Sequence, residues 1–126
     1  MKTSLHKLIA TTALGLALCS QSAPARAGLQ FRPEVSVYSN YARGSMAGAR
    51  YSADGTQYIG CNFYSPVVSC GATDKTGKSL SCKAYGLHWA TAIKSITDFS
   101  HILFTVAADG TTCSSLDVDN FSQHLK

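Results

Sequence analysis

The centre of the chain carries the stretch VVSCGATDKTGKSLSCKA, which runs from Val67 to Ala84. Apolar or small residues alternate with polar ones on both sides of a polar loop, and a period of two is typical of half-buried β-strands. A loop that is symmetric about Thr76 sets Cys70 opposite Cys82, both on the apolar face. The stretch therefore predicts an antiparallel hairpin with a tip from Asp74 to Gly77.

The cysteines around this hairpin predict two disulfides. Of the five cysteines, Cys19 lies in an N-terminal leader described below, and the other four lie in the remaining chain. An even number of cysteines in an exported domain is typical of disulfides, and four allow three pairings. The hairpin register favours a bond between Cys70 and Cys82, which leaves Cys61 to pair with Cys113. No C-x-x-C pair is present, so we expect no metal site.

A second hairpin is expected upstream. The sequence Ala53-Asp54-Gly55-Thr56 separates two extended runs, 45–52 and 57–65, and an Asp-Gly pair between such runs is typical of a two-residue hairpin turn. In this register Tyr51 faces Tyr58. Pro66 is expected to interrupt the sheet, because proline lacks the amide hydrogen that a strand needs.

A helix and a third hairpin are expected downstream. Trp89, Ala92, Ile93 and Ile96 have helical spacing, which predicts a helix over 87–97. After it, residues 101–107 alternate, and the Asp-Gly turn at 108–111 sets Val106 opposite Cys113 and Phe104 opposite Ser115. Val35 and Val37 indicate a short edge strand. We therefore predict an α+β domain over 28–126, with one antiparallel sheet of five or six strands and one covering helix.

The N-terminal segment, 1–27, has the pattern of a secretory signal peptide. It combines a basic head, an apolar run from Leu8 to Leu18 and the cut-site sequence Ala25-Arg26-Ala27. The segment predicts a periplasmic or extracellular protein. Lipid attachment at Cys19 is not expected, because Leu18 is not the small residue that lipoprotein processing needs.

The leader also accounts for most of the net charge. The chain has 11 Lys and Arg against 7 Asp and Glu, and removal of Lys2, Lys7 and Arg26 lowers the net charge from +4 to about +1. Overall charge therefore gives no argument for nucleic-acid binding. No segment reaches the roughly 18 apolar residues that span a bilayer.

The sequence offers little support for catalysis. His88 and His101 are candidate bases for a small hydrolase, with an aspartate brought close by folding, but neither lies in a catalytic motif. Ser45 lacks the G-x-S-x-G spacing of a nucleophile elbow. Asp117 and Asp119 lack the glycine and distal glutamate of a calcium loop. We expect no cofactor, no metal and no catalytic residue.

The strongest candidate for a binding surface is aromatic. Tyr51 and Tyr58 pair across the expected upstream hairpin, Tyr64 continues that face, and Arg43 lies nearby in the sequence. Tyrosine supplies broad contact area at low entropic cost, so this face predicts a non-enzymatic module that binds a protein or a glycan. An inhibitor of an envelope or host hydrolase, acting through the loop 74–78, is an alternative. The oligomeric state is left open.

The segment from Gly44 to Cys61, together with Ser81-Cys82 and the segment from Cys113 to Asn120, resembles a group of short exported bacterial proteins of uncharacterised function. The resemblance implies export and a β-rich domain with two disulfides. It transfers no catalytic or ligand-binding residue to this chain.

Overall fold

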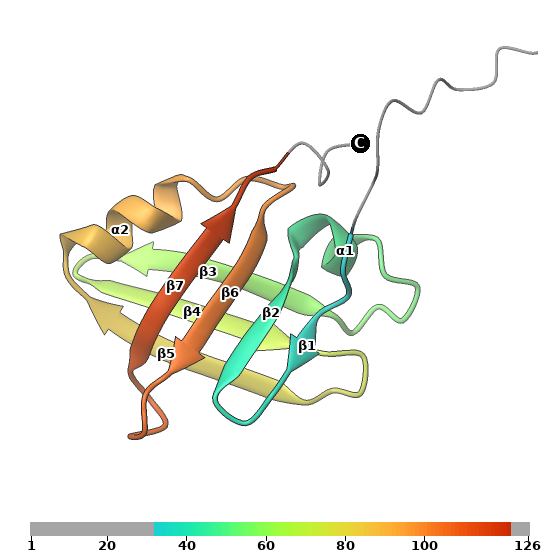
Figure 1. Cartoon of the computed structure of the whole chain (residues 1–126), viewed down its shortest axis with the longest axis horizontal. Coiled ribbons are helices and arrows are strands. Elements are labelled where there is room, and N and C mark those ends of the chain that lie inside the picture. The colour runs from blue at the N-terminus through green and yellow to red at the C-terminus, as the bar shows by residue number, and fades with distance from the viewer. Residues whose placement is uncertain (1–31, 122–126) are drawn as a thin grey trace, which may run out of the picture.

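The protein forms a sandwich of two antiparallel sheets. In a computed structural model, which describes residues 32–121, the strands have the order β1-β2-β6-β7 in one sheet and β3-β4-β5 in the other. Figure 1 shows the four-stranded sheet in front of the three-stranded sheet, with strands that cross. The α+β class, the antiparallel pairing and the two disulfides are confirmed, but the seven strands form two sheets and a second helix is present. The predicted leader, 1–27, lies outside the described residues.

The four-stranded sheet comprises β1 (Ser36–Val37), β2 (Tyr41–Ser45), β6 (His101–Val106) and β7 (Cys113–Asp119). The predicted edge strand and the hairpin of β6 and β7 are both confirmed. Val106 pairs with Cys113 as predicted, whereas a register shift between Thr105 and Val106 places Phe104 opposite Leu116 instead of Ser115. An extra residue on one strand of a pair produces such a shift.

The three-stranded sheet comprises β3 (Tyr58–Tyr64), β4 (Val67–Thr73) and β5 (Ser79–Tyr85). The hairpin of β4 and β5 has the predicted register, with Cys70 opposite Cys82. Its tip is held by Asp74, whose Oδ1 accepts hydrogen bonds from the amides of Thr76 and Lys78. The alternating pattern was sufficient here because the turn is local and one face is buried.

The predicted upstream hairpin is wrong. Residues Met46–Arg50 form α1, a short helix, where a strand was expected. Ser45 ends β2 and caps this helix, because its Oγ accepts a hydrogen bond from the amide of Gly48. Gly48 lies so close to the neighbouring chain that an added Cβ would be 2.5 Å from the Pro33 carbonyl oxygen. Small residues in α1 therefore serve close packing.

As a consequence, β3 pairs with β4. Ser65 and Pro66 form the loop between these two strands, so that Tyr64 lies opposite Val67 and Cys61 lies opposite Cys70. Pro66 was predicted to interrupt the sheet, and it is instead the turn of a hairpin. Proline is tolerated there because a turn residue need not donate to the ladder.

The predicted disulfide pairing is also wrong. Cys61 bonds Cys70, with Cα atoms 4.0 Å apart, and Cys82 bonds Cys113, with Cα atoms 5.0 Å apart. The pairing of β3 with β4 brings Cys61 beside Cys70. Cys82 therefore bonds a cysteine of the other sheet. Cys82–Cys113 therefore links the two sheets, next to a hydrogen bond from the amide of Lys83 to the carbonyl oxygen of Thr111.

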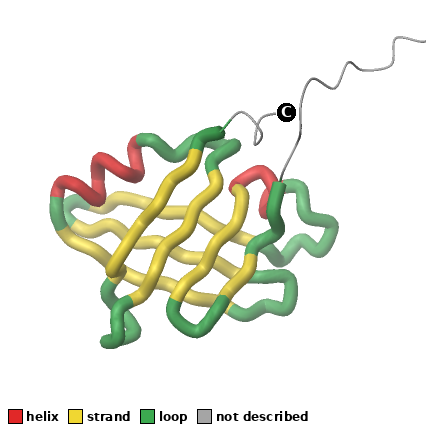
Figure 2. The backbone as a smooth tube through the Cα atoms, viewed as in Figure 1, coloured by secondary structure: helices red, strands yellow, loops and turns green. Residues whose placement is uncertain are grey.

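The predicted helix is present as α2 (Leu87–Lys94), which ends earlier than expected. Figure 2 shows α2 at one end of the sandwich and α1 at the other. Trp89, Ile93 and Ile96 pack against the core, and Ala90 is buried. The core lies between the sheets, with Phe104, Ile102 and Val68 as its largest fully buried apolar side chains.

Candidate functional site

The structure brings together two of the four predicted binding residues. Tyr58 and Tyr64 lie on one face of β3, because their positions in the strand differ by an even number. Tyr51 lies at the C-terminal end of α1, off the sheet, because the strand that was to carry it is a helix. Arg43 lies in β2 of the other sheet, where its guanidinium carbon is 5.9 Å from the centre of the Tyr38 ring. The four residues therefore do not form one cluster: two lie on one face of β3, and two lie elsewhere.

The outer face of the three-stranded sheet is the surface that carries Tyr58 and Tyr64. Register partners in antiparallel strands point to the same side of a sheet. We use "outer face" for the side chains on this side: Tyr58, Gly60, Asn62, Tyr64, Val67, Ser69, Gly71, Thr73, Ser79, Ser81, Lys83 and Tyr85. Tyrosines stand at both ends of this face, and small or polar residues fill its middle.

Tyr85 is the member of the outer face that sequence reasoning missed. It lies across Val67 from Tyr64, and it is 64% exposed. The signal was present in β5, where Ser79, Ser81, Lys83 and Tyr85 alternate with the buried positions. A third aromatic residue could have been assigned to the face from this period alone.

The ring of Tyr58 lies over two glycines. A Cβ added at Gly71 would be 3.4 Å from Cε1 of Tyr58, and one added at Gly60 would be 3.6 Å from its hydroxyl oxygen. These two glycines are register partners on β4 and β3. The ring therefore rests on the backbone of the sheet, and Tyr58 keeps 55% of its surface exposed.

Tyr58 also borders two hollows. One, of about 260 Å³, lies on the sheet and includes Thr73, Ser79 and Ser81. The other, of about 190 Å³, lies between α1 and β3 and includes Met46 and Ile59. Tyr58 thus borders a hollow that carries three hydroxyl side chains and a second hollow that is mainly apolar.

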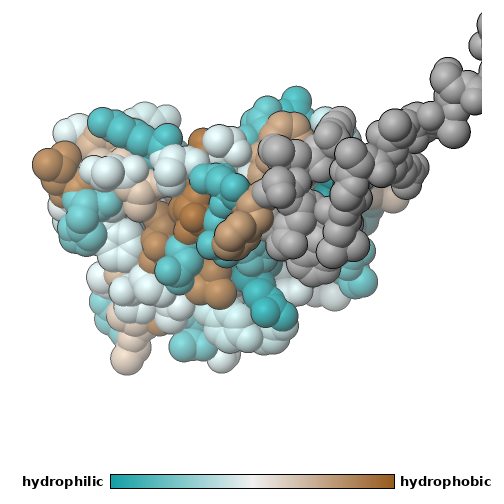
Figure 3. Space-filling view, turned by 45° about the horizontal axis from the view of Figure 1, so that its top comes forward, coloured by the Kyte–Doolittle hydropathy of each residue, from teal (hydrophilic) through white to brown (hydrophobic). Residues whose placement is uncertain are grey.

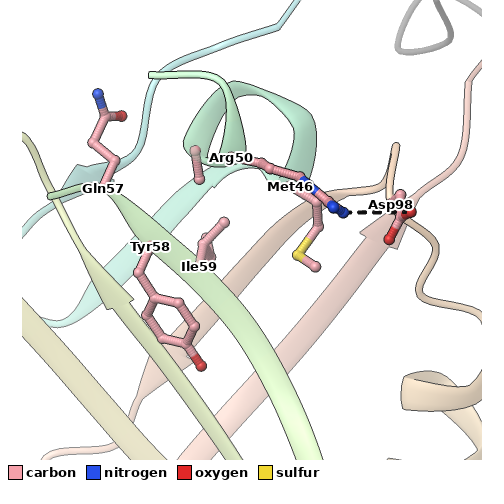
Figure 4. Close-up of a pocket in the computed structure, with 7 residues that line it drawn as sticks. Met46, Arg50, Gln57, Tyr58, Ile59 and Asp98 are labelled. Carbon is pink, nitrogen blue, oxygen red and sulfur yellow. Dashed lines mark ion pairs between the residues drawn. The ribbon is translucent and has the colours of Figure 1, made fainter. Parts of the chain in front are cut away.

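The apolar hollow has a charged rim (Figure 4). The side chain of Arg50 points to Asp98, with Nη1 3.7 Å from Oδ2. Both side chains are mostly exposed, so this ion pair contributes little to stability. The rim offers both a donor and an acceptor, on the other side of β3 from the Tyr58 ring (Figure 4).

Neither candidate histidine lies in a complete catalytic arrangement among residues 32–121. His101 lies between Ser45 and Asp119 in one row across β2, β6 and β7, with Nδ1 4.0 Å from the Asp119 carboxylate, beyond hydrogen-bond distance. Ser45 is fully buried and caps α1. His88 is exposed, with its ring centre 5.2 Å from that of Trp89.

Three aspartates hold turns. The Gln57 side chain and the amides of Thr56 and Gln57 donate to Asp54 and lower its pKa to about 2. The side chain and amide of Thr112 and the amide of Thr111 likewise lower the pKa of Asp109 to about 2. Hydrogen bonds from Thr76, the largest from its hydroxyl, lower the pKa of Asp74. A bond to a carboxylate favours its charged form.

These bonds occupy the aspartates of the Asp-Gly turns and of the tip between β4 and β5. In the described part of the chain, no group of three His, Cys, Asp or Glu side chains could hold a metal ion. Asp117 and Asp119 lie on β7 and belong to no such group.

The comparisons with known proteins returned no match to a family model, a curated protein or a solved structure. The resemblance to short exported bacterial proteins therefore stays a prediction. Within 32–121, no helix has the length and apolar character needed to cross a bilayer.

Proposed function

We propose that the protein is a non-enzymatic binding module that recognises a glycan through the outer face of its three-stranded sheet. The position of the Tyr58 ring carries this proposal. A ring that lies over Gly60 and Gly71 offers an exposed aromatic surface, on which the apolar face of a sugar can stack.

The surroundings of Tyr58 suit a chain of sugars. Hydroxyls of Thr73, Ser79 and Ser81 border the hollow on the sheet, and Arg50 and Asp98 border the other hollow. Each can exchange hydrogen bonds with sugar hydroxyls. A glycan that stacks on Tyr58 can therefore extend along the outer face, where the hollow on the sheet provides a site for its neighbouring unit.

The middle of the outer face favours a glycan over a protein. Protein interfaces have an apolar centre with a polar rim. Here the centre is small and polar, with Asn62, Ser69, Gly71 and Ser81, and the aromatic residues stand at the ends. Lys83 is the one charged side chain of this face, so few charges need to be desolvated on binding.

We further propose that the protein acts in the periplasm or outside the cell. The two disulfides and the predicted signal peptide support this location, because disulfides persist in oxidising compartments. A binding module exposed to that environment benefits from covalent links between its strands.

The experiment is a matched pair of substitutions. Tyr58→Ser and Tyr51→Ser remove equally exposed rings, 55% and 56% exposed, but Tyr51 lies off the face. The protein is first screened on a glycan microarray, and the best oligosaccharide is then titrated by calorimetry. We expect Tyr58→Ser to weaken binding about 5- to 150-fold, since stacking of a ring is worth about 1–3 kcal/mol in comparable aromatic platforms, and Tyr51→Ser to leave it unchanged.

Equal binding by the folded Tyr58→Ser variant, or the absence of any bound glycan on the array, would contradict the proposal. Circular dichroism of both variants checks the fold.

An inhibitor remains the second candidate function. The loop between β4 and β5 is held by three hydrogen bonds to Asp74 Oδ1, and Lys75 Nζ lies 3.0 Å from Glu34. A rigid loop loses little entropy when it enters an active site. Inhibition of an envelope hydrolase that is lost when Lys75 and Thr76 are replaced by alanine would favour this function.

A further inference from the structure

A further hollow lies beside the hollow on the sheet that Tyr58 borders. It has a volume of about 290 Å³, and Ser81 borders both hollows. Its other side chains from the outer face are Ser69 and Lys83, which are register partners on β4 and β5. We call it the Lys83 hollow. A cavity of about 150 Å³ holds a benzene molecule, so the Lys83 hollow has room for one substituted six-membered ring.

The loop between β6 and β7 forms one wall of the Lys83 hollow. Gly110 and Thr111 border the hollow from this loop. The amide of Lys83 donates a hydrogen bond of 2.8 Å to the carbonyl oxygen of Thr111, and the disulfide Cys82–Cys113 joins the same two segments. These links hold the wall in place in the free protein, so little entropy is lost in forming the hollow when a ligand binds.

The Lys83 hollow lies within reach of a sugar that stacks on Tyr58. The Tyr58 ring lies over Gly71, whose register partner is Ser81. Lys83 is two residues further along β5, and two residues of a strand span about 7 Å. The next unit of a glycan on the Tyr58 ring therefore passes Ser81 and reaches the Lys83 hollow.

Lys83 gives the outer face a positive charge that no carboxylate of this face balances. The outer face contains no aspartate or glutamate, and Lys83 takes part in no ion pair with the described residues, 32–121. The loop at the wall of the hollow contains one acid, Asp109. Its Oδ1 accepts hydrogen bonds from the amides of Thr111 and Thr112, which hold it in its own turn.

The exposed face of the four-stranded sheet offers a different environment. Arg43 and Asp117 both lie there, since each is a register partner of Leu103, and Asp119 follows on the same side of β7. On the side of the molecule that Figure 3 shows, hydrophilic residues are mixed with hydrophobic ones. An anion would approach two carboxylates on that sheet and none on the outer face, so charge complementarity favours the outer face.

We infer, on the basis of the proposed glycan function, that the glycan is acidic and that its carboxylate or sulfate group binds the Lys83 ammonium in the Lys83 hollow. An ammonium group donates charge-assisted hydrogen bonds to such an oxyanion, and the hydroxyls of Ser69 and Ser81 can donate to its other oxygens. The Tyr58 ring supplies affinity for the sugar ring, and Lys83 supplies selectivity for acidic over neutral glycans.

The test compares acidic oligosaccharides with neutral forms of the same sugars. Oligogalacturonates are paired with their methyl esters, and sulfated carrageenan oligosaccharides are paired with their desulfated forms. Each is titrated into the oxidised protein by calorimetry. We expect the acidic member of at least one pair to bind more tightly than its neutral form, and added salt to reduce this difference, because salt screens the Lys83 charge. The pair that shows the difference distinguishes a carboxylate from a sulfate.

Lys83→Gln and Lys94→Gln form a matched pair of variants, because both lysines are exposed and Lys94 lies in α2, off the outer face. We expect Lys83→Gln to weaken binding of the acidic probe about fivefold to tenfold, between the effects of losing an exposed ion pair and a charge-assisted hydrogen bond. Binding of the neutral form should not change, and Lys94→Gln should alter neither. Equal binding of acidic and neutral forms, or unchanged binding by the folded Lys83→Gln variant, overturns the inference.

Dependence on Tyr58 separates this inference from the proposed function. Equal binding of both members of a pair that is lost in Tyr58→Ser overturns the acidic glycan and leaves the glycan function standing. Binding to none of these probes also overturns the inference, and the glycan microarray then decides the proposed function separately.

Discussion

At the scale of the residue, the aspartates of the Asp-Gly turns have the clearest structural role. Asp54 and Asp109 each precede a glycine with positive φ, Gly55 and Gly110, and each accepts hydrogen bonds from the amides that follow the glycine. The same Asp-Gly pair thus forms a hairpin in one place and a link from helix to strand in the other. Local hydrogen bonding determines the turn, and the flanking segments determine its use.

The turn aspartates make stability depend on acid pH. The pKa of Asp109 is about 2 in the folded protein, below its ordinary value of 3.8, so its contribution is present above pH 3.8 and is lost as the pH falls toward 2. We expect the melting temperature to fall over this range, and to fall less in Asp109→Asn, which carries no titrating group there. Thermal denaturation followed by circular dichroism from pH 2 to pH 5 measures this.

Asp98→Asn is the control for this measurement, because Asp98 takes part in an exposed ion pair with Arg50. A pH profile of Asp109→Asn as steep as that of the unmodified protein would contradict the prediction.

At the scale of the element, the register of β3 decides two features at once. Pairing with β4 places Cys61 beside Cys70, and it places Tyr58 over Gly71. The predicted upstream strand does not form. The disulfide pairing and the composition of the outer face therefore both differ from the prediction. The disulfides now have different duties, since one joins neighbouring strands and the other joins sheets.

The disulfide between sheets should contribute more stability than the one between neighbouring strands. Cys82–Cys113 has a sequence separation of 31 and Cys61–Cys70 a separation of 9. In the chain-entropy model these loops are worth about 3.5–4 and about 2.5 kcal/mol. We expect the double variant Cys82→Ala/Cys113→Ala to lose more free energy of unfolding in urea than Cys61→Ala/Cys70→Ala.

Peptide mapping of the unreduced protein provides an independent check of this pairing. Linked peptides that contain Cys70 with Cys82 would contradict it, and so would equal losses of stability in the two double variants.

At the scale of the whole molecule, a small core between two crossed sheets supports all of the exposed surfaces. Phe104 is fully buried in β6, whereas its neighbour Leu103 points to the other side of the same strand and is only partly buried. A domain of this size is stable by about 5–15 kcal/mol. The loss of one large core side chain therefore removes much of the total.

We expect Phe104→Ala to lower the free energy of unfolding by about 3–5 kcal/mol, because it removes apolar contacts and leaves a cavity. Leu103→Ala is the matched control and should cost clearly less, since Leu103 lies outside the core. Urea denaturation of both variants measures the difference, and equal losses would show that the two sheets do not pack through Phe104.

The sequence by itself determined the features that depend on neighbours along the chain. Alternation located β4, β5 and β6, helical spacing located α2, and turn residues placed Cys70 opposite Cys82. The sequence also predicted that Tyr58 and Tyr64 share a face, because a period of two within one strand settles it.

The tertiary structure alone decided the partner of β3 and the division of the strands into two sheets. Residues 45–52 alternate weakly and are rich in small side chains, so contact with Pro33 and capping by Ser45 made part of them a helix. Because these residues form a helix, β3 pairs with β4, and Cys61 bonds Cys70. Cys82 therefore bonds Cys113 in the other sheet, and Tyr51 and Arg43 do not lie on the outer face. Pairing between distant segments depends on packing of the whole chain, which short-range patterns of residues do not contain.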